Sequence, residues 1–245
     1  MTFTIAIEQM YFKKNHCYSQ NNYDKVCQMV YANNQYMSDY MIALAISGCL
    51  WWDHIHILRW YEEELKAVCK NKIHTYLEVG CGMGINLLHA MQAIKAEQYW
   101  AIDLSEKSVE LTKYLLLYAK EKGQIDGKNY RIECKNFFGL QLQKKADIFT
   151  MFEVLEHVPN PDEMLKNIKE VTEDNAEIFV STAINSPVPD HIYLFRSVKD
   201  VLNMVEQCGF QVKNMICAAA NGSEIKIVEE KEQPITIALR LQKNN

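Results

Sequence analysis

Short apolar runs alternate with helical patterns along the second part of the chain, from about residue 72 onward. This alternation is typical of a parallel β-sheet covered by helices, and it therefore predicts an α/β fold. Seven strands are predicted, at His74–Val79, Gln98–Asp103, Tyr130–Cys134, Asp147–Phe152, Ala176–Thr182, Phe210–Cys217 and Ile235–Leu241. Four helices are predicted among them, at Ile85–Ile94, Ser105–Glu121, Pro161–Val171 and Ser197–Cys208.

Residues 1–71 follow a different pattern, without clear strand alternation. Three helical stretches are predicted there, at Asp24–Tyr31, Met37–Leu50 and Asp53–Lys70. The segment is rich in aromatic residues, with seven of the 13 tyrosines and three of the four tryptophans. We interpret residues 1–71 as an N-terminal helical extension and residues 72–245 as the sheet domain.

The first predicted strand runs into a turn with three glycines at alternate positions, in the stretch Leu77-Glu78-Val79-Gly80-Cys81-Gly82-Met83-Gly84. Glycines in this arrangement let the backbone turn sharply and approach a ligand with no side chain in between. The acid Asp103 follows 19 residues after Gly84, at the end of the second predicted strand. A glycine turn followed by an acid on the next strand is typical of a Rossmann-like nucleoside site, where the acid binds ribose hydroxyls.

The residues around these glycines indicate which nucleoside binds. The turn reads E-x-G-x-G-x-G, and Ile85 stands where a dinucleotide-binding fingerprint has its third glycine. Glu78 would repel a pyrophosphate, whereas it suits a ligand that carries an amino group. The pattern resembles the first motif of class I S-adenosylmethionine (SAM)-dependent methyltransferases. The resemblance implies that the cofactor is SAM rather than NAD.

In that family the glycine loop passes under the methionine and ribose parts of SAM. The resemblance predicts a Rossmann-like seven-stranded sheet with an antiparallel final strand, and residues 1–71 as a lid over the cofactor and the acceptor. The residues that it assigns to the cofactor are Glu78, Gly80, Gly82, Gly84, Asp103, Leu104, Asn136, Phe137, Phe152 and Glu153. Asn136 stands where the family usually has an acid for the adenine amino group, and its side-chain carbonyl can accept the same hydrogen bond. Phe137 would pack on the adenine face.

The fourth predicted strand ends in the motif Glu153-Val154-Leu155-Glu156-His157-Val158. This motif resembles the corresponding part of the ubiquinone-biosynthesis O-methyltransferases, in which the strand end lies beside the transferring methyl group. His157 is the candidate general base, because an imidazole accepts a proton near neutral pH. The alternative is that His157 only braces a loop against a helix.

Glu153, Glu156 and His157 also resemble part of the metal site of small-RNA 2′-O-methyltransferases, and His191 could complete that set. We expect no metal here. Family members without a metal carry the same residues, and this acidic chain has no basic stripe for RNA.

The loop after the fifth strand, residues 184–195, is predicted to contact the acceptor, because ligands bind at the carboxyl ends of strands in such sheets. Two prolines constrain this loop and present Asp190, His191 and Tyr193. A plain proline-rich turn with surface polar groups is the alternative. The candidate catalytic residues are His157, His191 and Asp190, and the candidate substrate contacts are Trp52, His54 and Tyr193.

The composition limits the partners. The net charge is −5, and no cluster of Lys and Arg exceeds a pair, which argues against a nucleic-acid partner. The eight cysteines form no C-x-x-C pair, so reduced thiols are expected. Since neither a secretion signal nor a membrane-spanning run is visible, we expect a cytoplasmic protein without a membrane partner. A homodimer is left open.

These observations predict an enzyme that moves a methyl group from SAM to an O, N or C atom of a small molecule, in a secondary-metabolite or cofactor pathway. The resemblance covers about residues 72–220. One alternative is an enzyme that transfers or cyclises the aminopropyl part of SAM. Another is a non-catalytic SAM-binding regulatory partner, which the polar candidates His157, Asp190 and His191 argue against.

Overall fold

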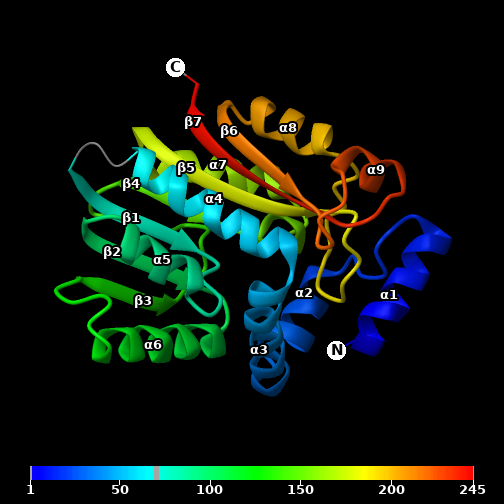
Figure 1. Cartoon of the computed structure of the whole chain (residues 1–245), viewed down its shortest axis with the longest axis horizontal. Coiled ribbons are helices and arrows are strands. Elements are labelled where there is room, and N and C mark those ends of the chain that lie inside the picture. Colours follow the sequence, from blue (N-terminus) through cyan, green and yellow to red (C-terminus); the bar gives the residue numbers. More distant parts are fainter. Residues whose placement is uncertain (1, 69–71, 245) are drawn as a thin grey trace.

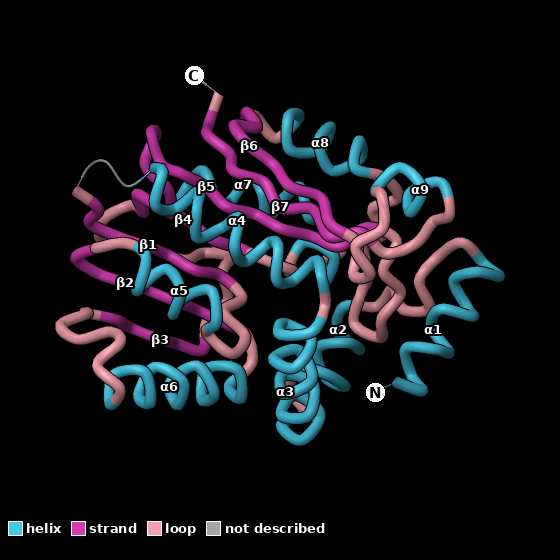
Figure 2. Tube along the Cα trace, in the orientation of Figure 1, coloured by secondary structure: helices cyan, strands magenta, loops and turns pink. Residues whose placement is uncertain are grey.

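A computed structural model of the chain describes residues 2–68 and 72–244, with side chains from residue 5 onward. Its centre is a seven-stranded sheet of strand order β3-β2-β1-β4-β5-β7-β6 (Figure 1, Figure 2). The strands are β1 (Ile73–Val79), β2 (Ala96–Asp103), β3 (Tyr130–Cys134), β4 (Ala146–Met151), β5 (Thr172–Ile184), β6 (Phe210–Ala218) and β7 (Ile235–Lys243). All neighbours are parallel except β7, which is antiparallel to both β5 and β6. The predicted fold class is confirmed.

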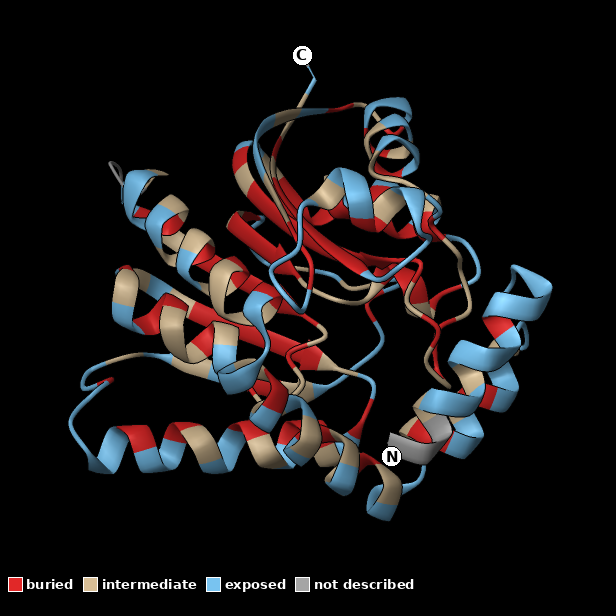
Figure 3. Ribbon diagram, turned by 45° about the vertical axis from the view of Figure 1, so that its right-hand side comes forward, coloured by how far each residue is buried: buried red, intermediate tan, exposed pale blue. Residues whose placement is uncertain are grey.

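Helices cover both faces of this sheet. One face carries α4 (Trp52–Val68), α5 (Ile85–Ala93) and α6 (Glu106–Glu121), and the other carries α7 (Pro161–Val171) and α8 (Val198–Gln207). Successive residues of a strand point to opposite faces, so Tyr76 packs in the cluster with α4–α6 and Leu77 packs in the cluster with α7–α8. The central strands are mostly buried (Figure 3). This double burial explains why they read as nearly continuous apolar runs.

The helices of the N-terminal part lie in two places. α1 (Thr2–Asn15), α2 (Tyr23–Val26), the π-helix η1 (Cys27–Tyr31) and α3 (Asn34–Leu50) lie beyond the carboxyl ends of the strands (Figure 1). α4 instead packs on the sheet, through buried residues spaced one helical turn apart, Ile57, Tyr61 and Leu65. The change of pattern at residue 72 therefore marks the first strand, and the helical layer on the sheet begins before it.

Most predicted helices agree with the structure to within a few residues. Three helices of the described residues were not predicted. They are α1, the short 3₁₀ helix η2 (Leu155–His157) and the short α9 (Ile225–Glu230), which lies inside a segment that is polar in sequence. The predicted end of the helix 53–70 lies outside the described residues, as α4 is described only to Val68.

The seven cysteines in the described part of the chain carry free thiols. Across residues 2–68 and 72–244, no single helix has both the length and the apolar composition needed to cross a bilayer. α3 and α4 meet that criterion only when taken together, and the chain bends by 79° between them.

Candidate active site

The glycine turn after β1 requires its glycines for two separate reasons. Gly80, Gly82 and Gly84 all have positive φ angles, of 73°, 53° and 79°, where side chains are strained. A Cβ atom on Gly80 would overlap Val154, and one on Gly84 would lie 2.7 Å from Thr112 Cγ2. The turn is therefore packed closely from below while its backbone remains open toward the cavity described next.

Asp103 fixes this turn to the end of β2. Its Oδ2 accepts a hydrogen bond from Gly82 N at 2.9 Å, and its Oδ1 accepts one from Ser105 N at 2.9 Å. Burial raises the pKa of Asp103, and these backbone donors oppose the rise. A carboxylate offers about four acceptor directions, and the backbone N–H groups of Ser105, Gly82 and Leu104 use three of them, so one remains for a ligand in the cavity that Asp103 lines.

A cavity of about 1340 Å³ lies over the carboxyl ends of the strands, between them and helices α1 and α3. It exceeds the roughly 300–1,000 Å³ of ordinary small-ligand pockets. The glycine turn and the loop after β5 both contribute to its wall. One continuous cavity thus has room for more than one ligand.

The structure brings most of the predicted cofactor residues to this cavity. Those that line it are Gly80, Gly82, Asp103, Leu104, Asn136, Phe137, Phe152 and Glu153. Among the described residues, Glu78 and Gly84 are not part of the wall. Glu78 lies beneath the turn, where its Oε2 accepts a hydrogen bond from Tyr76 Oη at 2.8 Å. Burial raises the pKa of Glu78 to about 8.

Two of the lining residues are used differently from the prediction. Asn136 Oδ1 already accepts a hydrogen bond from Phe138 N at 2.9 Å, which closes a local turn. Phe137 is only 3% exposed and its ring packs on Phe149, whereas Phe138 is 46% exposed and lines the cavity. Phe138 therefore offers the more accessible aromatic face.

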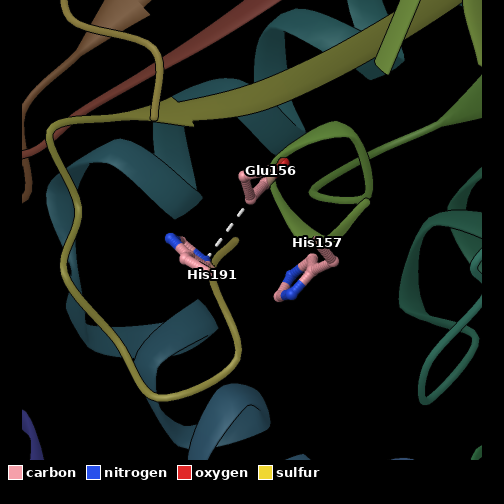
Figure 4. A group of neighbouring side chains, drawn as sticks. All are labelled: Glu156, His157 and His191. Carbon is pink, nitrogen blue, oxygen red and sulfur yellow. Dashed lines mark ion pairs between the residues drawn. The ribbon is translucent and has the colours of Figure 1, made fainter. Parts of the chain in front are cut away.

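Three side chains of the candidate catalytic region meet at one end of the cavity (Figure 4). Glu156 and His157 come from η2 (Leu155–His157), the short 3₁₀ helix after β4, and His191 comes from the loop after β5. Their potential ligand atoms all lie within 4.8 Å of one another. The two imidazole rings meet edge to face, with centroids 4.8 Å apart. The structure therefore brings His157 and His191 together at this end of the cavity.

Hydrogen bonds determine which nitrogen of each ring is free. His191 Nδ1 lies 2.6 Å from the Ser186 carbonyl oxygen, and His157 Nδ1 lies 3.1 Å from that of Asp190. A carbonyl oxygen can only accept, so both Nδ1 atoms carry the hydrogen and both Nε2 atoms keep a lone pair. Asp190 Oδ2 also lies 3.3 Å from His157 Nδ1. The Asp190 side chain and backbone therefore both lie beside Nδ1 of His157.

The electrostatics of this end of the cavity follow from burial. Burial lowers the pKa of His191 well below its usual value, with His157 adding to the effect, so His191 is neutral at pH 7. Burial and the neighbouring Glu153 raise the pKa of Glu156 well above its usual value. Glu153 itself has its pKa raised to about 7 by burial. The region therefore combines two imidazole lone pairs with acids that are reluctant to ionise.

Glu156, His157 and His191 together form a donor set that could hold a divalent metal ion. His191 Nε2 lies 4.0 Å from Glu156 Oε1, as marked in Figure 4. Glu153, the fourth residue of the metal alternative, is not part of this donor set; its Oε1 accepts a hydrogen bond from Ser181 Oγ at 2.7 Å, and its side chain also contacts that of Glu156. The geometry is thus compatible with a base at Nε2 and with a bound cation.

The three residues predicted to contact the substrate do not all line the cavity. His54 lines the cavity, with Ser47 Oγ 3.3 Å from its Nδ1, and burial lowers the pKa of His54. Trp52 does not belong to the described wall, because its ring stacks on His56 with centroids 3.8 Å apart. Its neighbour Trp51 lines the cavity instead.

Tyr193 also lies away from the described wall. Its backbone N donates to the Glu156 carbonyl oxygen at 2.9 Å, and its ring packs on Phe195 with centroids 4.7 Å apart. The Tyr193 side chain is partly buried against the core. Neither Trp52 nor Tyr193 is thus among the described residues that line the cavity.

Two tyrosines that were not predicted lie on the wall near Asp190. They are Tyr31 of η1 and Tyr40 of α3, and the pKa of each is raised well above its usual value by burial and then by the Asp190 carboxylate. The abundance of tyrosine in residues 1–71 was the available signal. It could not single out these two, because the packing of η1 and α3 decides which rings face the cavity.

A family model described as "Methyltransferase domain" matches residues 57–214 of this sequence. The chain belongs to this methyltransferase family. The assignment confirms the predicted class of SAM-dependent methyltransferases, with SAM as the cofactor.

Several named ubiquinone biosynthesis O-methyltransferases are similar to this methyltransferase. The protein from Dechloromonas aromatica is 28% identical over 166 residues, which cover 63% of this chain and 66% of that relative. The protein from Nitrosospira multiformis is 30% identical over 129 residues, which cover 53% of this chain and 51% of that relative. The matched region thus spans between about half and just under two thirds of these relatives.

Solved structures share the fold at lower identity. Magnesium protoporphyrin IX methyltransferase (ChlM) from Synechocystis, solved with bound SAM, gives a TM-score of 0.60 at 16% identity, covering 78% of this chain and 80% of that one. The [4+2]-cyclase SpnF gives a TM-score of 0.58 at 14% identity, covering 76% and 80%. These structural similarities support the fold, whereas the chemistry depends on the residues of this chain's own site.

Proposed function

We propose that this methyltransferase moves the methyl group of SAM to a hydroxyl group of a mostly apolar small molecule, with His157 as the general base. The observation that carries the proposal is the single cavity that joins the glycine turn and Asp103 to His157 and His191. A cofactor bound at one end would place its reactive group toward the other.

The cofactor end is formed by backbone and by one acid. Gly80 and Gly82 would pass under the methionine and ribose of SAM, and the Asp103 carboxylate would accept a hydrogen bond from the ribose hydroxyls. Leu104 and Phe138 enclose the adenine from its two sides. Glu78 supports the turn from below and does not contact SAM directly.

The chemical step requires alignment and the removal of one proton. An acceptor oxygen attacks the methyl carbon in line with the C–S bond, that bond breaks, and S-adenosylhomocysteine leaves. The proton of the acceptor hydroxyl passes to His157 Nε2, the ring nitrogen that keeps its lone pair. Asp190, beside Nδ1, holds this tautomer and stabilises the imidazolium that forms.

The chemical class of the acceptor is inferred from the residues that line the cavity and from the proteins of similar sequence. Apolar and aromatic side chains of η1, α3 and the α3–α4 corner line the acceptor end, among them Tyr31, Tyr40, Met41 and Trp51. The similar proteins are O-methyltransferases, which favours oxygen over nitrogen or carbon as the attacked atom.

A divalent ion held by Glu156, His157 and His191 is the second candidate arrangement. Metal bonds of about 2.0–2.2 Å in a tetrahedral site place two ligand atoms roughly 3.4 Å apart, so His191 Nε2 and Glu156 Oε1, at 4.0 Å, would have to move closer together to share an ion. The hydrogen bonds at both Nδ1 atoms are also those that orient histidine ligands. Such an ion would lower the pKa of the acceptor hydroxyl in place of a base.

One experiment tests the proposal and separates these arrangements. The full chain is incubated with methyl-labelled SAM and cell extract, and mass spectrometry follows labelled products together with the fate of the cofactor. S-adenosylhomocysteine and a labelled acceptor are expected, whereas methylthioadenosine would indicate aminopropyl transfer. His157→Gln should abolish most of the product, and His56→Gln, an imidazole outside the described wall, is the matched control.

A chelator is added in a second arm of the same experiment. The base mechanism predicts no loss of activity with the chelator. Loss of activity that an added divalent ion restores would establish the metal arrangement. Full activity in His157→Gln would contradict both, and the reaction would then depend on positioning alone.

A further inference from the structure

Tyr18 connects the N-terminal segment to the loop that carries His191. It lies between α1 and α2, and it is 8% exposed. Its hydroxyl oxygen accepts a hydrogen bond from Ser186 N at 3.0 Å. Its ring packs between Phe12 and His191, with centroids 5.8 Å from each. Tyr18 is therefore anchored on both sides, by its ring and by its hydroxyl.

Ser186 uses its backbone for two contacts of different kind. Its N–H donates to Tyr18, and its carbonyl oxygen accepts the Nδ1–H of His191 at 2.6 Å. The residue before it, Asn185, has a φ of 49°, in the left-handed region, and the residue after it is Pro187. Ser186 lies outside the helices and strands, and Asn185 before it is held by hydrogen bonds to the Phe195 and Arg196 carbonyl oxygens; the Tyr18 hydroxyl holds the amide of Ser186 itself.

The orientation of Ser186 in turn determines the orientation of His191. As long as the Ser186 carbonyl accepts from Nδ1, the imidazole keeps its lone pair on Nε2, which faces Glu156 Oε1 at 4.0 Å (Figure 4). Glu156 is held from its other oxygen, which accepts a hydrogen bond from Thr182 Oγ1 at 2.8 Å. A single chain of contacts thus runs from Tyr18 to the buried acid beside His157.

We infer that Tyr18 is a positioning residue of the active site, which fixes the tautomer and the direction of the His191 imidazole through the backbone of Ser186. The inference rests on the proposed function in so far as His191 belongs to the acceptor end of the cavity. The N-terminal segment then does more than cover that end, because it holds one of the side chains in place.

The first test reads His191 directly and needs neither an acceptor nor turnover. The full chain is labelled with ¹⁵N-histidine, and the Nδ1 and Nε2 resonances are recorded for the wild type and for Tyr18→Phe, which keeps the ring and removes the hydroxyl. The His191 signals, assigned with His191→Gln, should move away from the pure Nδ1–H tautomer in Tyr18→Phe. Tyr11→Phe changes an exposed tyrosine of α1 and should leave them unchanged. Unchanged His191 signals in a folded Tyr18→Phe protein would overturn the inference.

The second test is a double-mutant cycle in the methylation assay. Tyr18→Phe should lower kcat roughly 10- to 100-fold, the range for a misplaced group at an active site, while the Kd for SAM stays unchanged. In the His191→Gln background the same substitution should cause no further loss, because its effect passes through His191. Equal losses in both backgrounds would contradict a positioning role. If the wild type gives no labelled product, the proposed function fails, and the resonance test still decides the role of Tyr18.

Discussion

Asp103 offers a prediction that can be measured without knowing the acceptor. In the structure its carboxylate accepts hydrogen bonds from Gly82 N and Ser105 N, both at 2.9 Å, and Asp103 lines the cavity. Asp103→Ala removes the proposed ribose contacts and also the bond that fixes the turn at Gly82. We expect weaker binding of SAM and of S-adenosylhomocysteine to the same extent, since both carry the same ribose.

The magnitude follows from the number of contacts removed. A hydrogen bond to a charged group contributes about 1.5–3 kcal/mol. If the ribose contacts of Asp103 together contribute an amount in that range, the Kd for SAM should rise by about 10- to 150-fold. Isothermal titration calorimetry on the purified full chain measures this directly, with the wild type titrated under the same conditions.

Two comparisons make the result decisive. Glu106→Ala removes an exposed acid in the first turn of α6, close in sequence but outside the described wall of the cavity, and should leave the Kd for SAM unchanged. Ionised Asp103 is disfavoured by burial, so Asp103→Ala should not unfold the protein, and a thermal melt verifies this. An unchanged Kd in a folded Asp103→Ala variant would refute the ribose assignment. Tight binding of NAD in place of SAM would refute the cofactor placement as a whole.

Three further predictions concern other parts of the molecule. His157→Gln should lower kcat roughly 10²–10⁴-fold in a turnover assay while calorimetry gives an unchanged Kd for SAM; an equal loss of SAM affinity would contradict a base. His54→Ala should raise the KM for the acceptor, whereas Trp52→Ala should leave it unchanged; the reverse result would restore Trp52 to the substrate site. The pKa of Glu78 is about 8 in the folded state, against a usual 4.5. Between these pH values Glu78 is protonated in the native state and ionised in the unfolded state, so the free energy of unfolding should fall as the pH rises through that range. In urea unfolding, the free energy of unfolding of the wild type should fall by on the order of 4 kcal/mol between about pH 5 and pH 8.5, and Glu78→Gln should abolish this fall. If the wild type and Glu78→Gln differed by the same amount at every pH, Glu78 would not be buried and protonated.

Local residue types were enough to predict the elements and the cofactor turn. Ser105 and Ser197 begin helices because each side chain accepts a hydrogen bond from the backbone N–H three residues later, at Ser108 and Asp200. The glycine turn depends on positive φ angles, which glycine adopts at little cost. Such signals act within a few residues, so they survive in the sequence and were confirmed by the fold.

Local residue types could not predict which of two adjacent aromatic residues exposes its ring to the cavity. Phe137 and Phe138 are adjacent in sequence and both line the cavity, yet Phe137 is only 3% exposed whereas Phe138 is 46% exposed. Trp51 and Trp52 divide likewise at the corner between α3 and α4. Which member of a pair faces the cavity depends on the rotation of the backbone at a turn, and packing partners distant in sequence set that rotation.

The sequence by itself determined the sheet, the order of its motifs and the end of the sheet at which ligands bind, because parallel strands bring their carboxyl ends to one edge. Only the tertiary structure decided which side chains meet there. His157 and His191 come from separate loops, and their Nε2 atoms are directed into one cavity by carbonyl groups of Asp190 and Ser186. The physical reason is that a side chain's direction and protonation depend on hydrogen-bond partners and burial, which exist only once the chain is folded.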